Sequence, residues 1–301
     1  YNEAVAIAVA ACAADTVGQT CYICLGPGDE EEGLVRGCSC RGGAGCAHVS
    51  CLARQAEVAV GRDHGPRWVR WYTCGLCKQK HHGVTRCALG WACWKMYVGR
   101  PETDQLRMPA MSLLANGLSA AKHLEDSVSV MEAELSMARR FRTSEERILI
   151  TQSNLANAYG LIGRRQEALR IRAAVYSEEL KLHGEENERT LTAANNYASS
   201  LKNLSHFGDA KALIRRTVPL ARRVLGEGHR LTLKMRWLYA QSLYKEATLD
   251  DLREAVTILE DTERTARRVF GGAHPLVVGI EESLRNARAA LGARETPSTS
   301  A

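Results

Sequence analysis

The distribution of cysteine is the feature that most constrains how this chain can fold. All eleven cysteines of the 301 residues lie before position 94, and none follows. A secreted protein held by disulfides would be small or would spread its bridges along its length, and an odd number would leave one thiol unpaired. The clustering therefore indicates metal binding, confined to the N-terminal third of the chain.

Seven of these cysteines and one histidine form four closely spaced pairs. The pairs are Cys21 with Cys24, Cys38 with Cys40, His48 with Cys51, and Cys74 with Cys77. Short spacing lets a tight turn direct both side chains at one ion, and thiolates with imidazole are typical ligands of tetrahedral zinc. Four pairs predict two zinc ions. Neither CxxC pair lies in the βαβ pattern of a thioredoxin-like redox motif.

The order and spacing of these pairs resemble those of RING-CH fingers, the zinc modules of a class of ubiquitin ligases. The matching stretch is "CYIC…LVRGCSCRGGAGCAHVSCL…WYTCGLC", from Cys21 to about Lys80. The PHD finger, a histone-tail reader, usually has two or more residues inside its second pair and four or five before the histidine. This chain has one and seven, which favours RING-CH.

The resemblance implies a cross-braced fold in which alternate pairs share an ion. The implied ligands of the first zinc are Cys21, Cys24, His48 and Cys51, and those of the second are Cys38, Cys40, Cys74 and Cys77. Cys46 is an alternative to His48, although the HxxC spacing favours the histidine. Metal binding and folding of this segment then become one event.

The resemblance also implies a function without a covalent intermediate on this chain. A RING holds a charged ubiquitin-conjugating enzyme so that its thioester is oriented for a substrate lysine, which is catalysis by proximity. By resemblance, Ile23 is the exposed apolar contact for that enzyme, with Leu52 and Trp71 beside it. Lys78 stands where active RINGs often place a basic residue that contacts ubiquitin.

Three features depart from the family pattern. Gln55 and Gly75 stand where many members have tryptophan and proline. Most well-known RING-CH ligases also carry membrane helices, whereas the longest apolar run here, Ala4–Ala14, is shorter than the ~18 residues that a span needs. We therefore expect a soluble variant that is cytoplasmic, with a nuclear location as the alternative. Residues 1–20 are expected to be a disordered or truncated N-terminus.

The cysteine-free part repeats itself with a period of 42 residues. Alanines recur at positions 156, 198 and 240, and again at 168, 210 and 255, where the last interval is 45. Each unit reads as two amphipathic helices, and a weaker copy begins at Leu113. The pattern resembles tetratricopeptide repeats of the kinesin-light-chain kind, which implies an all-α solenoid of about four repeats over residues 105–294.

Stacked repeats usually bind extended peptides on their concave face. In such repeats Asn154, Asn157 and Asn196 occupy positions that often clamp a ligand's backbone, although each could equally be a solvated or capping asparagine. The fold class is therefore a small zinc-stabilised cross-brace RING-CH domain followed by an all-α tetratricopeptide-repeat solenoid. The domains are residues 21–80, an aromatic helical joint at 81–104, the repeats at 105–294 and a disordered tail at 295–301.

The charges argue against nucleic acid as a partner. Lys and Arg exceed Asp and Glu by three up to Arg100 and by three after it, without a basic stripe. We expect a RING-type ubiquitin ligase whose finger recruits the conjugating enzyme and ubiquitin and whose repeats bind a protein substrate or adaptor, each half folding alone. The alternatives are a non-catalytic zinc-finger scaffold and, less favoured, a PHD-type histone reader.

Overall fold

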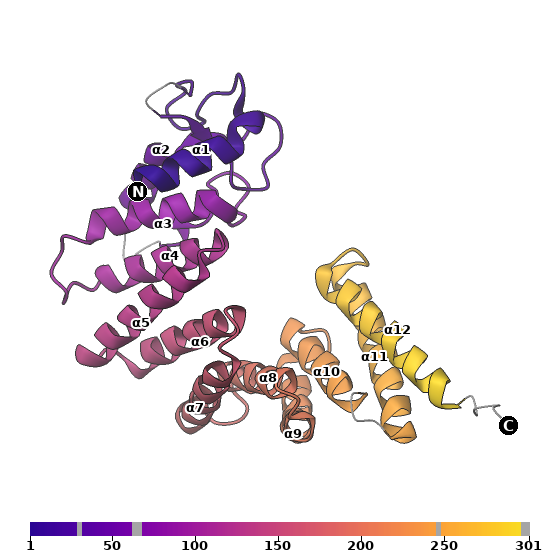
Figure 1. Cartoon of the computed structure of the whole chain (residues 1–301). Coiled ribbons are helices and arrows are strands. Elements are labelled where there is room, and N and C mark those ends of the chain that lie inside the picture. The colour runs from indigo at the N-terminus through magenta and orange to yellow at the C-terminus, as the bar shows by residue number, and fades with distance from the viewer. Residues whose placement is uncertain (29–31, 62–67, 245–247, 296–301) are drawn as a thin grey trace. The chain divides into compact units, whose positions relative to one another are not determined.

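The computed structural model describes residues 1–28, 32–61, 68–244 and 248–295, most of them in helices (Figure 1). The chain divides into two compact units, Tyr1–Ile162 and Gly163–Ala301. A cysteine-rich region precedes a long series of helix pairs, so the predicted fold class is confirmed. The expected tail at 295–301 lies outside the described residues except for Glu295, which ends the last helix.

The first unit holds the metal-ligand pairs among short elements and then four longer helices. Its elements are α1 (Asn2–Thr16), β1 (Leu34–Val35), β2 (Ala47–His48), α2 (Val49–Gly61), η1 (Trp68–Trp71), α3 (Gly83–Tyr97), α4 (Arg107–Ala120), α5 (Leu124–Arg140) and α6 (Glu145–Leu161). Strands β1 and β2 pair antiparallel, with Leu34 opposite His48. One apolar core runs through α1, α2 and α3, so the finger shares its core with the helices around it.

The N-terminal segment is a helix, which corrects the expectation of disorder over residues 1–20. Ala8 and Cys12, four residues apart on one face of α1, are buried against β1 and α3. The Cys12 thiol accepts a hydrogen bond from the backbone N–H of Arg36, 3.3 Å away. Packing of this face stabilises a helix that the alanine-rich sequence alone did not predict, because most helix stability in proteins comes from tertiary packing.

The joint helix α3 packs directly on α4, the first helix of the repeat region (Figure 1). Two glycines allow the contact. A Cβ at Gly90 would lie 2.9 Å from the Leu113 carbonyl oxygen, and one at Gly117 would lie 2.9 Å from the Arg86 carbonyl oxygen. The first compact unit thus crosses the predicted boundary near residue 105 and ends at Ile162. The structure does not support the expectation that each predicted half folds alone.

The repeats follow the predicted period in their backbone as well as in their sequence. The second unit contains α7 (Arg165–His183), α8 (Glu188–Asn203), α9 (Phe207–Leu225), α10 (Arg230–Leu243), α11 (Leu249–Phe270) and α12 (Pro275–Glu295). Residues in the left-handed region recur between repeats at positions 142, 184, 226 and 271. The alanines predicted at the helix crossings are all buried, as close packing of helix pairs requires.

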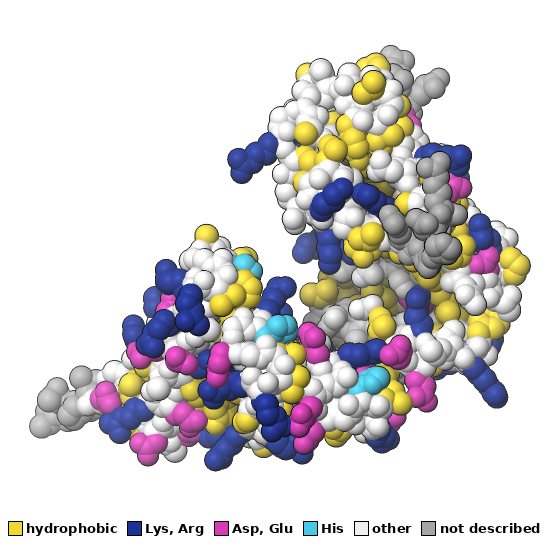
Figure 2. Space-filling model, turned by 180° about the vertical axis from the view of Figure 1, so that it is seen from behind, with side chains coloured by type: hydrophobic (Ala, Val, Ile, Leu, Met, Phe, Trp, Pro, Cys, Tyr) yellow, Lys and Arg dark blue, Asp and Glu magenta, His cyan; other side chains and the backbone are white. Residues whose placement is uncertain are grey.

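The N-termini of successive first helices are capped in the same way. Asn187, His229 and His274 each accept a hydrogen bond from the backbone N–H two residues later. These caps satisfy amide groups that a helix leaves without partners at its start. Figure 2 shows basic and acidic side chains mixed along the repeats on the face it displays, in keeping with the absence of a basic stripe.

Candidate metal centre

The four ligand pairs converge on two sites, each built from two pairs distant in the sequence. The ligand atoms of each group lie within 4.8 Å of one another, and the groups are Cys21, Cys24, His48 and Cys51, and Cys38, Cys40, Cys74 and Cys77. This is the interleaved arrangement that the resemblance implies. The two clusters fit a RING-type cross-brace.

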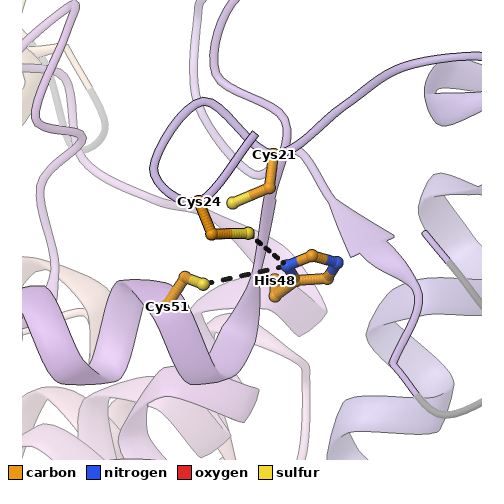
Figure 3. Close-up of side chains that lie close together, drawn as sticks. All are labelled: Cys21, Cys24, His48 and Cys51. Atoms are coloured by element: carbon orange, nitrogen blue, oxygen red, sulfur yellow. Dashed lines mark hydrogen bonds between the residues drawn. The ribbon is translucent and has the colours of Figure 1, made fainter. Parts of the chain in front are cut away.

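In the first group, secondary structure fixes the HxxC half. His48 ends β2 and Cys51 lies in the first turn of α2, so both side chains project from one strand-to-helix junction. The Cys24 and Cys51 sulfurs lie 3.4 and 3.7 Å from His48 Nδ1 (Figure 3). The other ring nitrogen, Nε2, lies 3.0 Å from the Pro27 carbonyl oxygen. A proton on Nε2 can be donated to that carbonyl, which leaves Nδ1 free to bind a metal.

These spacings match the edges of a tetrahedral zinc site. Ligand bonds of about 2.0–2.3 Å imply distances of roughly 3.3–3.8 Å between neighbouring ligand atoms. In the second group, the Cys40 and Cys74 sulfurs lie 3.8 Å apart. A Cβ at Gly45, whose φ is +83°, would lie 2.7 Å from the Cys40 Cβ. A side chain there would therefore disturb the position of Cys40, so glycine is needed beside the site.

The two CxxC turns are local copies of one structure, offset by 53 residues. The backbone N–H groups of Ile23 and Leu76 each lie 3.4 Å from the sulfur of the cysteine two residues before them. Those of Leu25 and Lys78 each donate to a cysteine carbonyl, at 2.8 and 3.2 Å. Both Leu25 and Lys78 have positive φ, at 65° and 59°. In each turn, backbone amides thus hold the first cysteine in place, and both cysteines of the turn belong to one ligand group.

The thiols differ in how readily they ionise. Burial raises the pKa of Cys21, but hydrogen bonds from the backbone at Cys24 and His48 lower it overall to about 7. A backbone hydrogen bond from Gln79 lowers the pKa of Cys77 to about 7. Burial and the neighbouring thiols raise the pKa of Cys51 to about 12. A bound dication would offset the repulsion among several thiolates in one small space.

The cysteines outside the four pairs belong to neither group. Cys46, the alternative to His48, is fully buried in the apolar core and belongs to neither cluster. Cys93 is buried in α3. His81, which is also buried, joins no cluster in the described part of the chain, and burial lowers its pKa to about 4. The donor set is therefore the one predicted from the spacing.

Of the predicted conjugating-enzyme contacts, only two reach the surface. Ile23 is half-buried, and Lys78 is exposed and donates to the carbonyl of Gly75. Leu52 and Trp71 are buried, at 6% and 1% exposure, so their side chains cannot be contacts. Both belong to the core that joins α2 and η1 to α3, which is where large apolar side chains are most stable.

Two exposed leucines extend this surface and were not predicted. Leu25 follows the first CxxC pair and is 76% exposed. Leu76, which is 48% exposed, occupies in the second pair the place that Ile23 has in the first. The sequence itself shows this equivalence, because Ile23 and Leu76 each stand directly before the second cysteine of a CxxC pair.

The two departures from the family pattern are neighbours in space. A Cβ at Gly75 would lie 3.2 Å from the Gln55 side-chain oxygen and 3.3 Å from the Tyr22 hydroxyl. A larger residue at position 75 would require the Gln55 side chain to move. The absence of a side chain at Gly75 therefore leaves room for the Gln55 side chain.

The three asparagines predicted to bind peptide are not one cluster. Asn154 lines a cavity in the first unit, whereas Asn157, three residues on, is exposed and lies outside that lining. Asn196 belongs to the second unit, where its carbonyl accepts from Arg172 at 3.5 Å. The cavity at Asn154 also holds further polar groups.

Two stretches of the chain match models of known domain families. Residues 21–87 match the RING-variant domain, seven residues beyond the predicted end of the finger, and residues 190–231 match a tetratricopeptide repeat. No curated protein sequence matches the chain. None of the helices in the described residues is both long and apolar enough to cross a membrane.

Solved structures of repeat proteins share the fold. The nearly identical TPR-like repeats of a candidate kinesin light chain from Podosopora anserina superpose with a TM-score of 0.54 at 21% identity, covering 65% of this chain and 90% of that one. BtubC (BKLC) from P. vanneervenii gives 0.50 at 18% identity, with 72% and 95% covered. At these identities the likeness concerns the fold. The chain thus joins a RING-variant domain to tetratricopeptide repeats.

Proposed function

We propose that this protein is a RING-type ubiquitin ligase. Two zinc ions, one in each ligand group, would hold the two CxxC turns in place and supply structure, not chemistry. The finger would then bind a charged ubiquitin-conjugating enzyme and orient its thioester for attack by a substrate lysine. The chain itself would form no covalent intermediate with ubiquitin.

The observation that carries this proposal is the exposed apolar surface on the paired turns. Ile23, Leu25 and Leu76 project from turns that the ligand clusters would make rigid, and the cationic Lys78 lies beside them. Apolar groups on a rigid frame bind a partner with little loss of conformational entropy. We therefore place the conjugating-enzyme contact on these turns.

The repeats support a role in protein binding. Tetratricopeptide repeats stack into extended concave surfaces of the kind that bind peptides. A substrate or adaptor bound there would be joined covalently to the finger, which raises its local concentration near the thioester.

Gln55 and Gly75 favour a second candidate, a zinc-finger scaffold without ligase activity. They replace residues typical of many active members on the side of the finger where the two turns meet. The two candidates share the fold and the metal, and differ only in whether ubiquitin is transferred.

A ubiquitin-chain assay separates the two candidates. The full-length chain would be incubated with ubiquitin, activating enzyme, ATP and each member of a panel of conjugating enzymes. The ligase proposal predicts chains with at least one member, and their loss when zinc is removed by a chelator. Leu182→Ala removes a leucine side chain from the repeats whose exposure, 43%, is close to the 48% of Leu76 in the finger. This variant should leave chain formation unchanged. Absence of chains with every member would favour the scaffold.

A further inference from the structure

A cavity of about 620 Å³ opens on the first unit, where the finger and the first repeats meet. Trp68, Tyr72 and Lys80 line it from the finger and Arg86 lines it from α3. Residues of α4, of the segment just before α4 and of α6 form the rest of the wall. All the lining residues precede Ile162, so the cavity belongs to one compact unit. Its volume lies within the ~300–1,000 Å³ range of pockets that bind ligands.

The cavity is lined by cations without acidic residues. Lys80, Arg86 and Arg147 contribute positive charge, and no aspartate or glutamate is among the lining residues. Arg147 forms an ion pair with the buried Glu134, whose carboxylate oxygen lies 3.3 Å from its guanidinium nitrogen. The four side chains together leave an excess of two positive charges at the wall.

Arg86 is the lining cation whose charge is most costly to leave without a counterion. It is half-buried, and burial lowers the pKa of its guanidinium. Among the described residues, no carboxylate forms an ion pair with Arg86 or with Lys80. A half-buried cation without a counterion is destabilising, so an anion entering the cavity would be stabilised by Arg86 and by Lys80, which lines the same cavity.

The rest of the wall suits a peptide. Asn154 lines the cavity, and its side-chain amide has no hydrogen-bond partner within the described chain, so it can pair with a peptide backbone. Trp68 and Tyr72 add aromatic surface for apolar side chains. A nucleic acid would require a longer basic track than the three cations of this cavity provide.

We infer that this cavity binds a carboxylate-rich peptide segment of the substrate, with two acidic side chains at Arg86 and Lys80 and the backbone at Asn154. The inference rests on the proposed ligase function only in calling the bound protein a substrate. Because the binding residues come from the finger, α3 and α6, the captured segment lies in the same compact unit as the conjugating-enzyme surface.

The test measures peptide retention on the immobilised, zinc-loaded full chain. The probes are three hexapeptide pools with random flanking residues and a fixed central pair of glutamate, glutamine or phosphoserine, and retained peptide is quantified by mass spectrometry. We expect the glutamate pool to be retained ~10-fold over the glutamine pool, since hydrogen bonds to charged groups contribute roughly 1.5–3 kcal/mol and 1.4 kcal/mol is ten-fold.

Matched variants locate the binding. Arg86→Gln and, separately, Lys80→Gln should each lower retention of the glutamate pool about five- to ten-fold. Arg139→Gln, the same change on the exposed end of α5, should leave it within about two-fold. Asn154→Ala should lower retention about three-fold, whereas Asn157→Ala, on the same helix outside the lining, should not change it.

Three results would overturn the inference. These are equal retention of the glutamate and glutamine pools, retention of the phosphoserine pool alone, and wild-type retention by both Arg86→Gln and Lys80→Gln. The assay contains no conjugating enzyme and no ubiquitin. Its failure therefore leaves the ligase proposal standing, and failure of the ubiquitin-chain assay leaves this binding site standing.

Discussion

Replacing Gly117 by alanine tests the packing that makes the finger and the first repeats one unit. Gly117 lies where α4 crosses α3, and an added Cβ would meet the Arg86 carbonyl oxygen at 2.9 Å and the Cys87 Cα at 3.0 Å. Both are backbone atoms of a helix, which cannot rotate away as the end of a side chain can. The two helices must separate or shift to admit the methyl group.

The magnitude follows from two opposing effects. Overpacking a well-filled core costs about 1–3 kcal/mol, and contact with backbone places Gly117→Ala at the upper end. Alanine is more favourable than glycine inside a helix by roughly 1 kcal/mol. The net effect is a loss of about 2 kcal/mol. For a unit of this size, such a loss lowers the melting temperature by roughly 4–8 °C.

Thermal unfolding followed by circular dichroism measures this effect, with zinc content determined alongside. The control is Gly208→Ala in α9, where an added Cβ would meet nothing within 4 Å. It should leave its unit as stable as before or slightly more stable. If Gly117→Ala melts at or above the wild-type temperature, the close contact of α3 and α4 is wrong, and with it the argument that this unit extends to Ile162.

Three further predictions concern the metal sites and one buried histidine. Cys24→Ser should lower bound zinc from two ions per chain and destabilise the first unit, while the helices of the second unit, Gly163–Ala301, keep their circular dichroism; unchanged zinc would contradict the ligand assignment. Gly45→Ala should weaken zinc binding at the second site at least ~10-fold in a chelator competition, because its Cβ would displace Cys40, whereas Gly42→Ala, with the same positive φ but open space, should have a smaller effect. Burial holds the pKa of His81 near 4, against 6.5 in the unfolded chain. The contribution of neutral His81 to the free energy of unfolding is therefore fully present above pH 6.5. It is lost as the pH falls toward 4, by at most roughly 3 kcal/mol. In urea titrations across that range, His81→Gln should show a shallower loss than wild type, and identical slopes would contradict burial of a neutral His81.

Spacing in the sequence was sufficient to predict the four metal-ligand pairs and the repeats, whereas the grouping of the pairs into two sites came from the family resemblance. Two residues between ligands limit a turn to one geometry, and Cys21 and Cys74 accordingly begin copies of the same backbone structure. The 42-residue period reappears in the helix caps at Asn187 and His229, because each repeat must satisfy the same amide groups at the same place. Local geometry determines both features, so local sequence reveals them.

Features that depend on tertiary packing were harder to predict. Leu52 and Trp71 stand beside metal ligands in the sequence, yet core packing decides that they are buried. Gly90 and Gly117 allow two helices to touch, but in the sequence a helical glycine reads only as a weak point.

The cavity could not be predicted for the same reason. Of its cations, Lys80 and Arg86 are six residues apart, but Arg147 is 61 residues further along the chain, and only the folded unit brings all three to one wall.

Single-turnover discharge of ubiquitin tests the central claim most directly. A conjugating enzyme charged with ubiquitin is mixed with free lysine and the full-length chain, and loss of the thioester is followed over time. The account predicts that the wild-type chain accelerates discharge. It also predicts that Ile23→Ala and Leu76→Ala, at unchanged zinc content, each lose about ten-fold or more of that acceleration, as expected for truncating a central interface contact. No acceleration with any conjugating enzyme, or full acceleration by both variants, would contradict it.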